Sequence, residues 1–443
     1  MAQSRGTGRQ LRHTFYASGN MGKSSLWSFV ELFALFYLTD ILGIPASVAG
    51  TIILLSLIWD GLTDPLMGMI ADRLRTRSPT VRLYFLTGAP VAAIAFIALF
   101  QAASVNPDYR IVYIFVVLIV LRTAYTIVDV PHNSMLSFLS SDSRDRTNIA
   151  SMRIFFSAVG RFGVTVLSMA MFKDQTTIPL VDRFSVASIW LAGIYLLVLA
   201  VCLAAIWNIR VHHARTPNLP FAPLALVRDM ASNSQLMIVF ALTAMTSLTT
   251  PIIGTAMIYF GKYGLGSESY GATALAIMAA AQAVSLLFWS KLSNRMIYKR
   301  HAAQMANLLL AAGMAASILL LVSPFALYTV AGVAGFAMGG IYMLNWSMLP
   351  DALDYGEIGR NGRPDMAVFG LFTLTNKAFI GLSQAIAGWT LALYGYEADS
   401  EATIASIGPI ITTLMTFPLV GALFCTMILR WHVQPQAPRA QRV

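Results

Sequence analysis

The chain has 443 residues, of which 57% are hydrophobic and only 11% charged, and its formal net charge is +10. A soluble domain carries about 25% charged residues, so this chain lacks the polar surface that a water-soluble fold of its size needs. Apolar runs of about 20 residues are typical of transmembrane helices, and the alternating segments of a membrane β-barrel are absent. The composition therefore excludes a soluble class and predicts an all-α membrane protein.

Twelve apolar segments follow one another, each long enough to cross a bilayer. The longest polar stretch, 209–232, lies between the sixth and seventh. We expect it to be a cytoplasmic linker, with a short helix on the membrane surface, between two six-helix halves, 1–208 and 233–443. The expected spans are 14–42, 47–71, 83–102, 110–137, 149–172, 184–208, 233–262, 269–293, 302–322, 326–349, 365–395 and 404–430.

Lysine and arginine are unevenly divided between the two sides of the predicted membrane. With both termini on one side, that side holds 21 of these residues and the other side four. Because cytoplasmic loops carry the excess, we expect both termini in the cytoplasm and the chain in a bacterial inner membrane. Topology then explains the basic surplus without a nucleic-acid partner. The polar N-terminus lacks the apolar core of a cleavable signal peptide, so none is expected.

Charged loops recur six spans apart. Asp72 and Arg73 follow the second span, and a basic cluster, 291–300, follows the eighth. The cluster 142–146 follows the fourth span, and the acidic loop 351–357 follows the tenth. Parallel six-helix repeats are typical of the major facilitator architecture, in which substrate binds between the halves. The pattern predicts that fold.

Nine charged residues lie at membrane depth, away from the ends of the predicted spans, where such groups usually face a cavity or a partner. Asp60 and Asp64 are spaced to share one helix face. Two carboxylates side by side in a low dielectric retain a proton or hold a cation between them, and Thr63 offers another oxygen ligand. We interpret the pair as a coupling site for Na⁺ or H⁺; the structural alternative is a helix-end motif kinked at Pro65.

The fourth span places four polar side chains on one face: Arg122, Tyr125, Thr126 and Asp129. Asp129 is suited to accept hydrogen bonds from substrate hydroxyls, while Thr126 is suited to face the cation. Arg153 on the fifth span is expected to be a counter-charge or a second substrate donor. One helix that touches both ligands would be a natural means of coupling them.

Other chemistry is not indicated by the residues. Lys377 could balance the acids when no cation is bound.

Cys202 and Cys425 lie in apolar runs, and only one of the six histidines, His132, lies well inside a span. We find no nucleophile–base arrangement, phosphate loop or metal cluster, so we expect neither an enzyme nor a cofactor.

Three motifs stand out in the chain: Ile58-Trp59-Asp60-Gly61-Leu62-Thr63-Asp64-Pro65, Tyr125-Thr126-Ile127-Val128-Asp129-Val130-Pro131 and Asp351-Ala352-Leu353-Asp354-Tyr355-Gly356-Glu357. They resemble those of the glycoside–pentoside–hexuronide:cation symporters, and the likeness extends over nearly the whole chain. The resemblance implies a Na⁺, Li⁺ or H⁺ site at Asp60, Asp64 and Thr126, although the family often has asparagine where Thr63 stands. It implies sugar contacts at Lys23, Asp129 and Arg153, a functional lysine at Lys377, and a cytoplasmic gate from Asp351 to Glu357.

Two positions depart from the galactoside-transporting members that the chain resembles. Those members carry an aspartate where this chain has Ser24, and a tryptophan where it has His132-Asn133. Glu31, about 10 Å further along the helix axis, is our hypothesis for the replacement acid. We therefore include Glu31 and Asn133 among the substrate residues.

The leading hypothesis is a monomeric symporter that imports a sugar or glycoside with Na⁺ or H⁺ by alternating access. Arg122 and Lys377 would balance charge during coupling. One alternative keeps the fold but carries an amphipathic lipid or another organic solute; a second is a non-transporting receptor or scaffold. The expected cytoplasmic gate consists of Asp72, Arg73, Asp351, Asp354 and Glu357.

Overall fold

The computed structural model describes residues 2–74, 81–171, 178–209, 223–320, 323–355, 365–394 and 401–432. These residues form thirteen α-helices and no strands. Twelve helices fall on the twelve predicted segments, and α7 is the short helix expected in the linker. The helices are α1 Ala2–Phe36, α2 Ala46–Leu74, α3 Arg82–Leu99, α4 Pro107–Leu139, α5 Ser143–Met171, α6 Leu180–Ile206, α7 Pro223–Ser232, α8 Ser234–Tyr259, α9 Glu268–Arg295, α10 Lys299–Leu320, α11 Pro324–Tyr355, α12 Asp365–Leu393 and α13 Glu401–Ile428.

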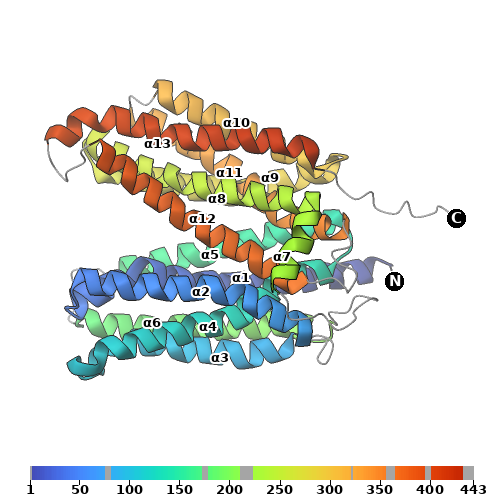
Figure 1. Ribbon diagram of the computed structural model, residues 1–443, viewed down its shortest axis with the longest axis horizontal. Helices are drawn as coiled ribbons and strands as arrows, with labels where there is room; N and C mark the ends of the chain where they lie inside the picture. Colours follow the sequence, from blue (N-terminus) through green and yellow to red (C-terminus); the bar gives the residue numbers. More distant parts are fainter. Residues whose placement is uncertain are drawn as a thin grey trace. The chain divides into compact units, whose positions relative to one another are not determined.

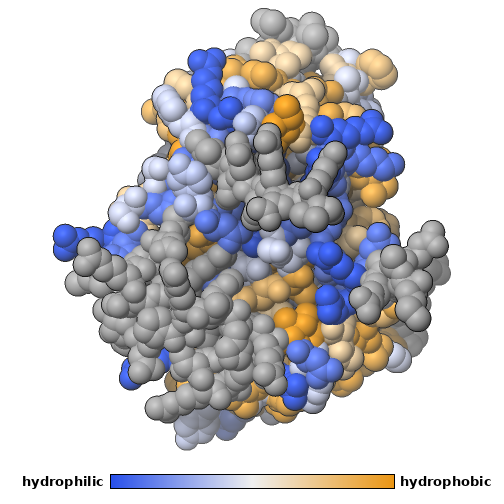
Figure 2. Space-filling view, turned by 90° about the vertical axis from the view of Figure 1, so that its right-hand side faces the viewer, coloured by the Kyte–Doolittle hydropathy of each residue, from blue (hydrophilic) through white to orange (hydrophobic). Residues whose placement is uncertain are grey.

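Ten of the described helices are long and apolar enough to cross a membrane by length and composition. The other two long helices, α1 and α10, match the first and ninth predicted segments. Large apolar side chains such as Ile94 and Trp190 are exposed along the helices, as expected of surfaces that face lipid rather than water. Figure 2, which views the right-hand end of Figure 1, shows hydrophilic residues gathered at that end. The all-helical membrane fold is confirmed.

Asparagine side chains start two of the helices. Asn106 accepts a hydrogen bond from the main-chain N–H of Asp108, with Pro107 at the first helical position of α4. Asn233 accepts from the N–H groups of Gln235 and Leu236 at the start of α8, each at 3.1 Å. Such caps satisfy N–H groups that have no partner within the helix.

The chain divides into two compact units, each described by itself. The start of α5 belongs to unit 2, and the start of α12 belongs to unit 1, so each unit takes in one helix end from the other part of the sequence. Unit 1 comprises Met1–Ser141, Met152–Phe221 and Asn361–Leu374; unit 2 comprises Asp142–Ser151, Ala222–Arg360 and Thr375–Val443.

Within unit 1, α1 packs on α6, and α4 packs on both α2 and α3 (Figure 1). An aromatic cluster joins α1, α3 and α6: Phe29 lies 4.9 Å from Phe100 between ring centroids, and Phe100 stacks on Phe184 at 5.8 Å. Aromatic contacts of this kind add about 0.5–1.5 kcal/mol beyond the area they bury. The cluster anchors α1, the helix that carries Lys23 and Trp27.

Within unit 2, α11 packs on α9 and α10, and α13 packs on α8 and α10. Gly335 and Gly339 let α11 approach the backbone of α9 so closely that an added Cβ would collide with it. The indole of Trp289 donates to the carbonyl of Phe336 at 2.7 Å. Close packing through small residues is typical of helices in membranes.

Candidate functional site

Asp60 and Asp64 lie one turn apart on α2, and neither is exposed. Thr126 from α4 lies between them: its hydroxyl oxygen is 3.2 Å from Oδ1 of Asp60 and 2.8 Å from Oδ1 of Asp64. We call these three residues the carboxylate site. The structure thus brings together three of the four predicted cation ligands.

Thr63, the fourth predicted ligand, is turned toward its own helix. Its hydroxyl donates to the main-chain carbonyl of Asp60 at 3.1 Å. The hydroxyl that bridges the two carboxyl groups therefore comes from α4 and not from α2.

Arg122 lies beside the carboxylate site, one turn before Thr126 on α4. Its NH1 is 3.6 Å from Oδ2 of Asp60, and its Nε donates to the hydroxyl of Ser56 at 2.9 Å. The guanidinium also lies over the ring of Trp27, 4.9 Å from the centroid. Arg122 therefore contacts Asp60 directly, and its role in charge balance stays a prediction. Ser56 was missed in the sequence, although it lies four residues before Asp60 and shares its helix face.

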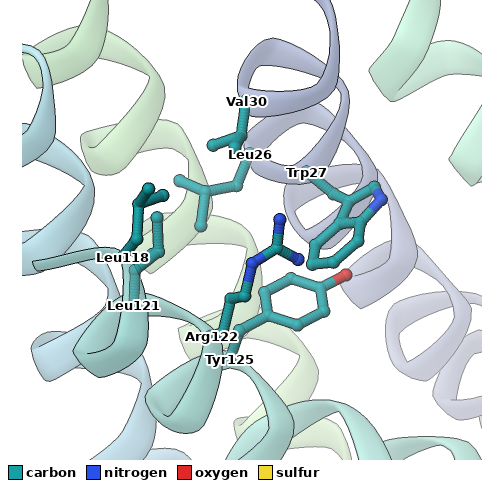
Figure 3. Close-up of a pocket in the computed structure, with 7 residues that line it drawn as sticks. All are labelled: Leu26, Trp27, Val30, Leu118, Leu121, Arg122 and Tyr125. Carbon is teal, nitrogen blue, oxygen red and sulfur yellow. The ribbon is translucent and has the colours of Figure 1, made fainter. Parts of the chain in front are cut away.

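The same arginine lines a small pocket between α1 and α4. In Figure 3 its guanidinium lies beside the rings of Trp27 and Tyr125, whose centroids are 5.1 Å apart. The indole N–H of Trp27 donates to the exposed carboxylate of Glu31, one turn along α1. Glu31 is therefore tied to this pocket, and its role toward substrate remains a prediction. The lining residues are Leu26, Trp27, Val30, Leu118, Leu121, Arg122 and Tyr125.

A second buried group of polar residues joins α1, α4 and α5. Nζ of Lys23 lies 2.6 Å from Oδ1 of Asp129 and 3.1 Å from Oδ1 of Asn133. The amide of Asn133 donates to Oδ2 of Asp129 at 2.8 Å, and Arg153 donates to Oδ1 of Asn133. We call these four residues the central network. It contains every predicted substrate residue except Glu31.

Tyr16 on α1 lies next to the central network. Its hydroxyl donates to the carbonyl of His132 at 2.7 Å, and its ring lies 5.9 Å from the guanidinium carbon of Arg153. The ring of His132 lies 4.6 Å from that of Tyr16 between centroids. Gly19 leaves no room for a Cβ here, because one would lie 2.9 Å from Nε2 of His132. Tyr16 was not predicted from the sequence, although its spacing of seven from Lys23 places both residues on one helix face.

The carboxylate site lies where α2 meets the start of α12. A Cβ on Gly370 would lie 2.5 Å from the carbonyl oxygen of Asp64, and one on Gly68 would collide with the backbone of Met366. Glycine thus permits backbone-to-backbone contact at both positions. A shift of the start of α12, which belongs to unit 1, would therefore displace the main chain of Asp64.

Asp72, a predicted gate residue, binds the first turn of α12. Its carboxylate accepts from the main-chain N–H groups of Met366 at 3.2 Å and Ala367 at 2.7 Å. A carboxylate at a helix N-terminus satisfies free N–H groups and interacts favourably with the helix dipole. Asp72 is buried whereas Arg73 is exposed, so the two neighbours have different surroundings.

Asp351, another predicted gate residue, is buried in unit 2 among cations. It accepts from Nζ of Lys299 at 2.8 Å, from NH1 of Arg146 at 3.1 Å and from the hydroxyl of Ser143 at 2.6 Å. Arg146 also pairs with Asp354, whose side chain is 28% exposed. The charged loops after the fourth and tenth spans therefore meet in one cluster.

Two predicted residues remain. Lys377 is half-buried on α12 and belongs to unit 2. Glu357 lies outside the described residues. The roles assigned to both stay predictions.

The donors of the carboxylate site are all oxygen atoms. Within the part of the chain that the structure describes, no group of three or more His, Cys, Asp and Glu side chains is arranged to hold a metal ion. Two carboxyl groups and one hydroxyl suit a proton or a hard monovalent cation better than a transition metal.

The described residues form twelve long helices that bury charged pairs between them, an arrangement typical of multi-pass membrane transporters. The family model described as MFS/sugar transport protein matches residues 15–432, so the chain belongs to that family. Solved structures agree on the fold. A bacterial homologue of the iron transporter ferroportin, in an outward-facing state, has a TM-score of 0.66 at 13% identity, covering 95% of this chain and 98% of that one. At that identity the likeness shows the major facilitator fold alone.

Curated relatives cover most of the chain. The putative glycoside/cation symporter YagG of Escherichia coli (strain K12) is 26% identical over 394 residues, covering 87% of this chain and 83% of the relative. The isoprimeverose transporter of Lactiplantibacillus pentosus is 25% identical over 439 residues, covering 96% and 89%. A glucuronide carrier protein homolog of Escherichia coli (strain K12) is 21% identical, covering 94% and 90%. These names bear out the resemblance to the glycoside–pentoside–hexuronide symporters.

Proposed function

We propose that this protein is a symporter that moves a sugar or glycoside inward together with Na⁺ or H⁺. The carboxylate site would carry the ion, and the central network would bind the sugar. Carboxylate, amide, ammonium and guanidinium groups in close array suit the hydroxyls of a sugar, because charge-assisted hydrogen bonds are the strong ones. The names of the curated relatives support the same class of cargo.

One observation carries the proposal. Thr126 contacts the carboxylate pair, and Asp129, three residues further along the same helix, holds Lys23 and Asn133. A small rotation or shift of α4 would disturb both sites at once. Coupling requires that each ligand change the affinity for the other, and a shared rigid helix provides a direct physical link.

Transport would proceed by alternating access, and the contacts of Asp72 and of Asp351 would act as a cytoplasmic gate. Asp72 holds the start of α12, and Asp351 holds Arg146 and Lys299. Both sets of contacts have to break or rearrange when helix ends separate. We also propose that the protein acts as a monomer in a bacterial inner membrane with both termini cytoplasmic, on the strength of the positive-inside pattern.

The test is uptake by purified protein in liposomes. Mono- and disaccharides and their glycosides are first screened for a rise in the unfolding temperature, and the stabilising compound is then supplied in labelled form under an inward Na⁺ or H⁺ gradient. Asp129→Asn should weaken sugar binding about 10–100-fold, since a hydrogen bond to a charged group contributes about 1.5–3 kcal/mol. Asp182→Asn, which changes an exposed acid of unit 1, is the matched control. Uptake indifferent to both gradients, or Asp129→Asn with unchanged affinity, would contradict the proposal.

A further inference from the structure

Four side chains form a polar stripe along α1, within unit 1. They follow one another at helical spacing, so they share one face of the helix. Three of them are partly exposed and the fourth is exposed, whereas every other residue from 22 to 30 is buried. The four residues of the stripe are Asn20, Ser24, Trp27 and Glu31.

The stripe lies at membrane depth and borders water. Glu31 falls well inside the first predicted span, 14–42, and a carboxylate at that depth faces a cavity or a partner rather than lipid. Because its side chain is exposed, this face of α1 lies along a water-accessible path. The stripe extends about 16 Å along the helix axis, which is more than a single sugar ring needs.

The indole of Trp27 lies one helical turn beyond the central network. Trp27 follows Lys23 by four residues on α1, so the two side chains share a helix face. On α4, Tyr125 precedes Asp129 by the same spacing. The rings of Trp27 and Tyr125 lie 5.1 Å apart between centroids, and the hydroxyl of Tyr125 is 3.5 Å from the main-chain carbonyl oxygen of Lys23. A ligand held by the central network would therefore have the indole beside it, about 6 Å along the helix axis.

Contacts on an edge and on a face hold the Trp27 indole in one orientation. Its N–H donates to the carboxylate of Glu31, one turn further along α1. The guanidinium of Arg122 lies over the ring, 4.9 Å from its centroid (Figure 3), and Arg122 is itself held by the hydroxyl of Ser56 at 2.9 Å. A fixed, partly exposed ring thus stands beside an exposed carboxylate, so that a flat apolar surface and a strong hydrogen-bond acceptor are adjacent.

A sugar ring has the complementary chemistry. The C–H groups of the ring form an apolar face that packs on an aromatic surface, and the hydroxyls around it donate to a carboxylate. An ionised carboxylate accepts several hydrogen bonds, so Glu31 can keep the indole N–H of Trp27 and still accept from a hydroxyl.

We propose that Trp27 and Glu31 form an outer subsite for a second sugar ring, next to the ring that the central network binds. The protein then selects a glycoside of two or more sugar rings over a free monosaccharide. The inference rests on the proposed symport function, whose cargo it specifies. It makes Trp27 a specificity-determining residue, which the sequence motifs did not indicate.

The experiment measures dissociation constants of the purified full-length protein for three ligands built on the sugar that the stabilisation screen identifies. They are the free monosaccharide, its methyl glycoside, and a disaccharide that carries this sugar at the non-reducing end. We expect the wild type to bind the disaccharide about 10-fold or more tightly than the methyl glycoside. Trp27→Ala should weaken binding of the disaccharide about 3–10-fold through the lost ring contact. Glu31→Gln should weaken it about 10-fold, because a hydrogen bond to a charged group is lost. Neither variant should change the affinity for the methyl glycoside.

Two variants outside the stripe are the matched controls. Leu32→Ala and Trp190→Ala remove exposed apolar side chains of α1 and α6, and they should leave all three affinities unchanged. Melting temperatures without ligand show whether each variant folds. Glu31→Gln changes only an exposed side chain, so it decides the matter even where Trp27→Ala does not fold.

Three results would overturn the inference. In the first, the disaccharide binds no more tightly than the methyl glycoside. In the second, Trp27→Ala or Glu31→Gln weakens all three ligands equally, which would mean that the residue shapes the central network instead. In the third, a phenyl glycoside gains as much as the disaccharide and Glu31→Gln changes neither, which would mean that the outer ring is not a sugar. Ion-driven uptake of the monosaccharide would still leave symport intact in each case, whereas uptake that ignores both gradients would refute symport itself.

Discussion

Replacing Asp351 with asparagine should weaken unit 2 more than any other single change in its charged cluster. Asp351 is 2% exposed and accepts hydrogen bonds from Lys299, Arg146 and Ser143. Asparagine keeps the shape of the side chain but removes its charge. Two buried cations would then share the site without the carboxylate between them.

The structure sets the size of the effect. Removing one partner of a buried ion pair costs about 3–5 kcal/mol, because the remaining charge is left uncompensated away from water. Asp354 provides the comparison, since it pairs with the same Arg146 but its side chain is 28% exposed. A pair that solvent reaches in this way contributes at most about 1 kcal/mol. We expect Asp351→Asn to cost several times more than Asp354→Asn.

The assay is thermal unfolding in detergent, with both variants beside the wild type. Asp351→Asn should lower the midpoint by roughly 3–5 °C and Asp354→Asn by about 1 °C or less. High salt should shrink the effect of Asp354→Asn, because exposed charges are screened, and should leave that of Asp351→Asn nearly unchanged. Equal shifts for the two variants, or a midpoint for Asp351→Asn like that of the wild type, would refute the view that the buried carboxylate holds this cluster together.

Three other changes test other parts of the chain. Gly370→Ala should reduce transport and lower the stability by about 1–3 kcal/mol, because its Cβ meets the carbonyl of Asp64. Gly381→Ala on the same helix, whose Cβ would have nothing within 4 Å, should be tolerated. Uptake and unfolding measured in parallel on the two variants test both expectations. Asp72→Ala should lower the stability by about 1 kcal/mol because it removes the cap of α12, and Asp72→Asn should lower it much less. We expect hydrogen exchange in the first turn of α12 to be faster in the alanine variant only. Burial lowers the pKa of His432 from 6.5 to about 4, so the unfolded state takes up a proton first as pH falls. The contribution of His432 to stability should be fully present above about pH 6.5 and decline by about 3 kcal/mol as pH falls to 4. His432→Phe should flatten this profile in melting curves recorded across pH. An unchanged profile would contradict the lowered pKa of His432.

Local periodicity was sufficient to find the acids of the carboxylate site. The spacing of Asp60 and Asp64 puts both on one face of any α-helix, whatever surrounds it. The same reasoning places Arg122, Thr126 and Asp129 on one face of α4, and the structure confirms that they are buried together. Helical spacing is a property of the backbone alone, so a sequence reports it directly.

Partners across helices could not be read in this way. Thr63 and Thr126 were both predicted as cation ligands, and only the packing of α4 against α2 places the hydroxyl of Thr126 between the two carboxyl groups. The gate acids were similarly ambiguous: Asp72 caps α12 instead of meeting a cation, while Asp351 meets two. Which side chains meet depends on the rotation and shift of one helix against another.

By itself, the sequence determined that this protein lies in a membrane, that it is built of helices, and that Asp60, Asp64 and Asp129 are buried, because composition and period reflect solvent preference and backbone geometry. Only the tertiary structure decided that Arg122 lies against Asp60 and that one helix serves both polar sites. Those facts depend on contacts between residues 62 to 110 positions apart, whose distances no local pattern encodes. The means of coupling proposed here therefore rests on packing.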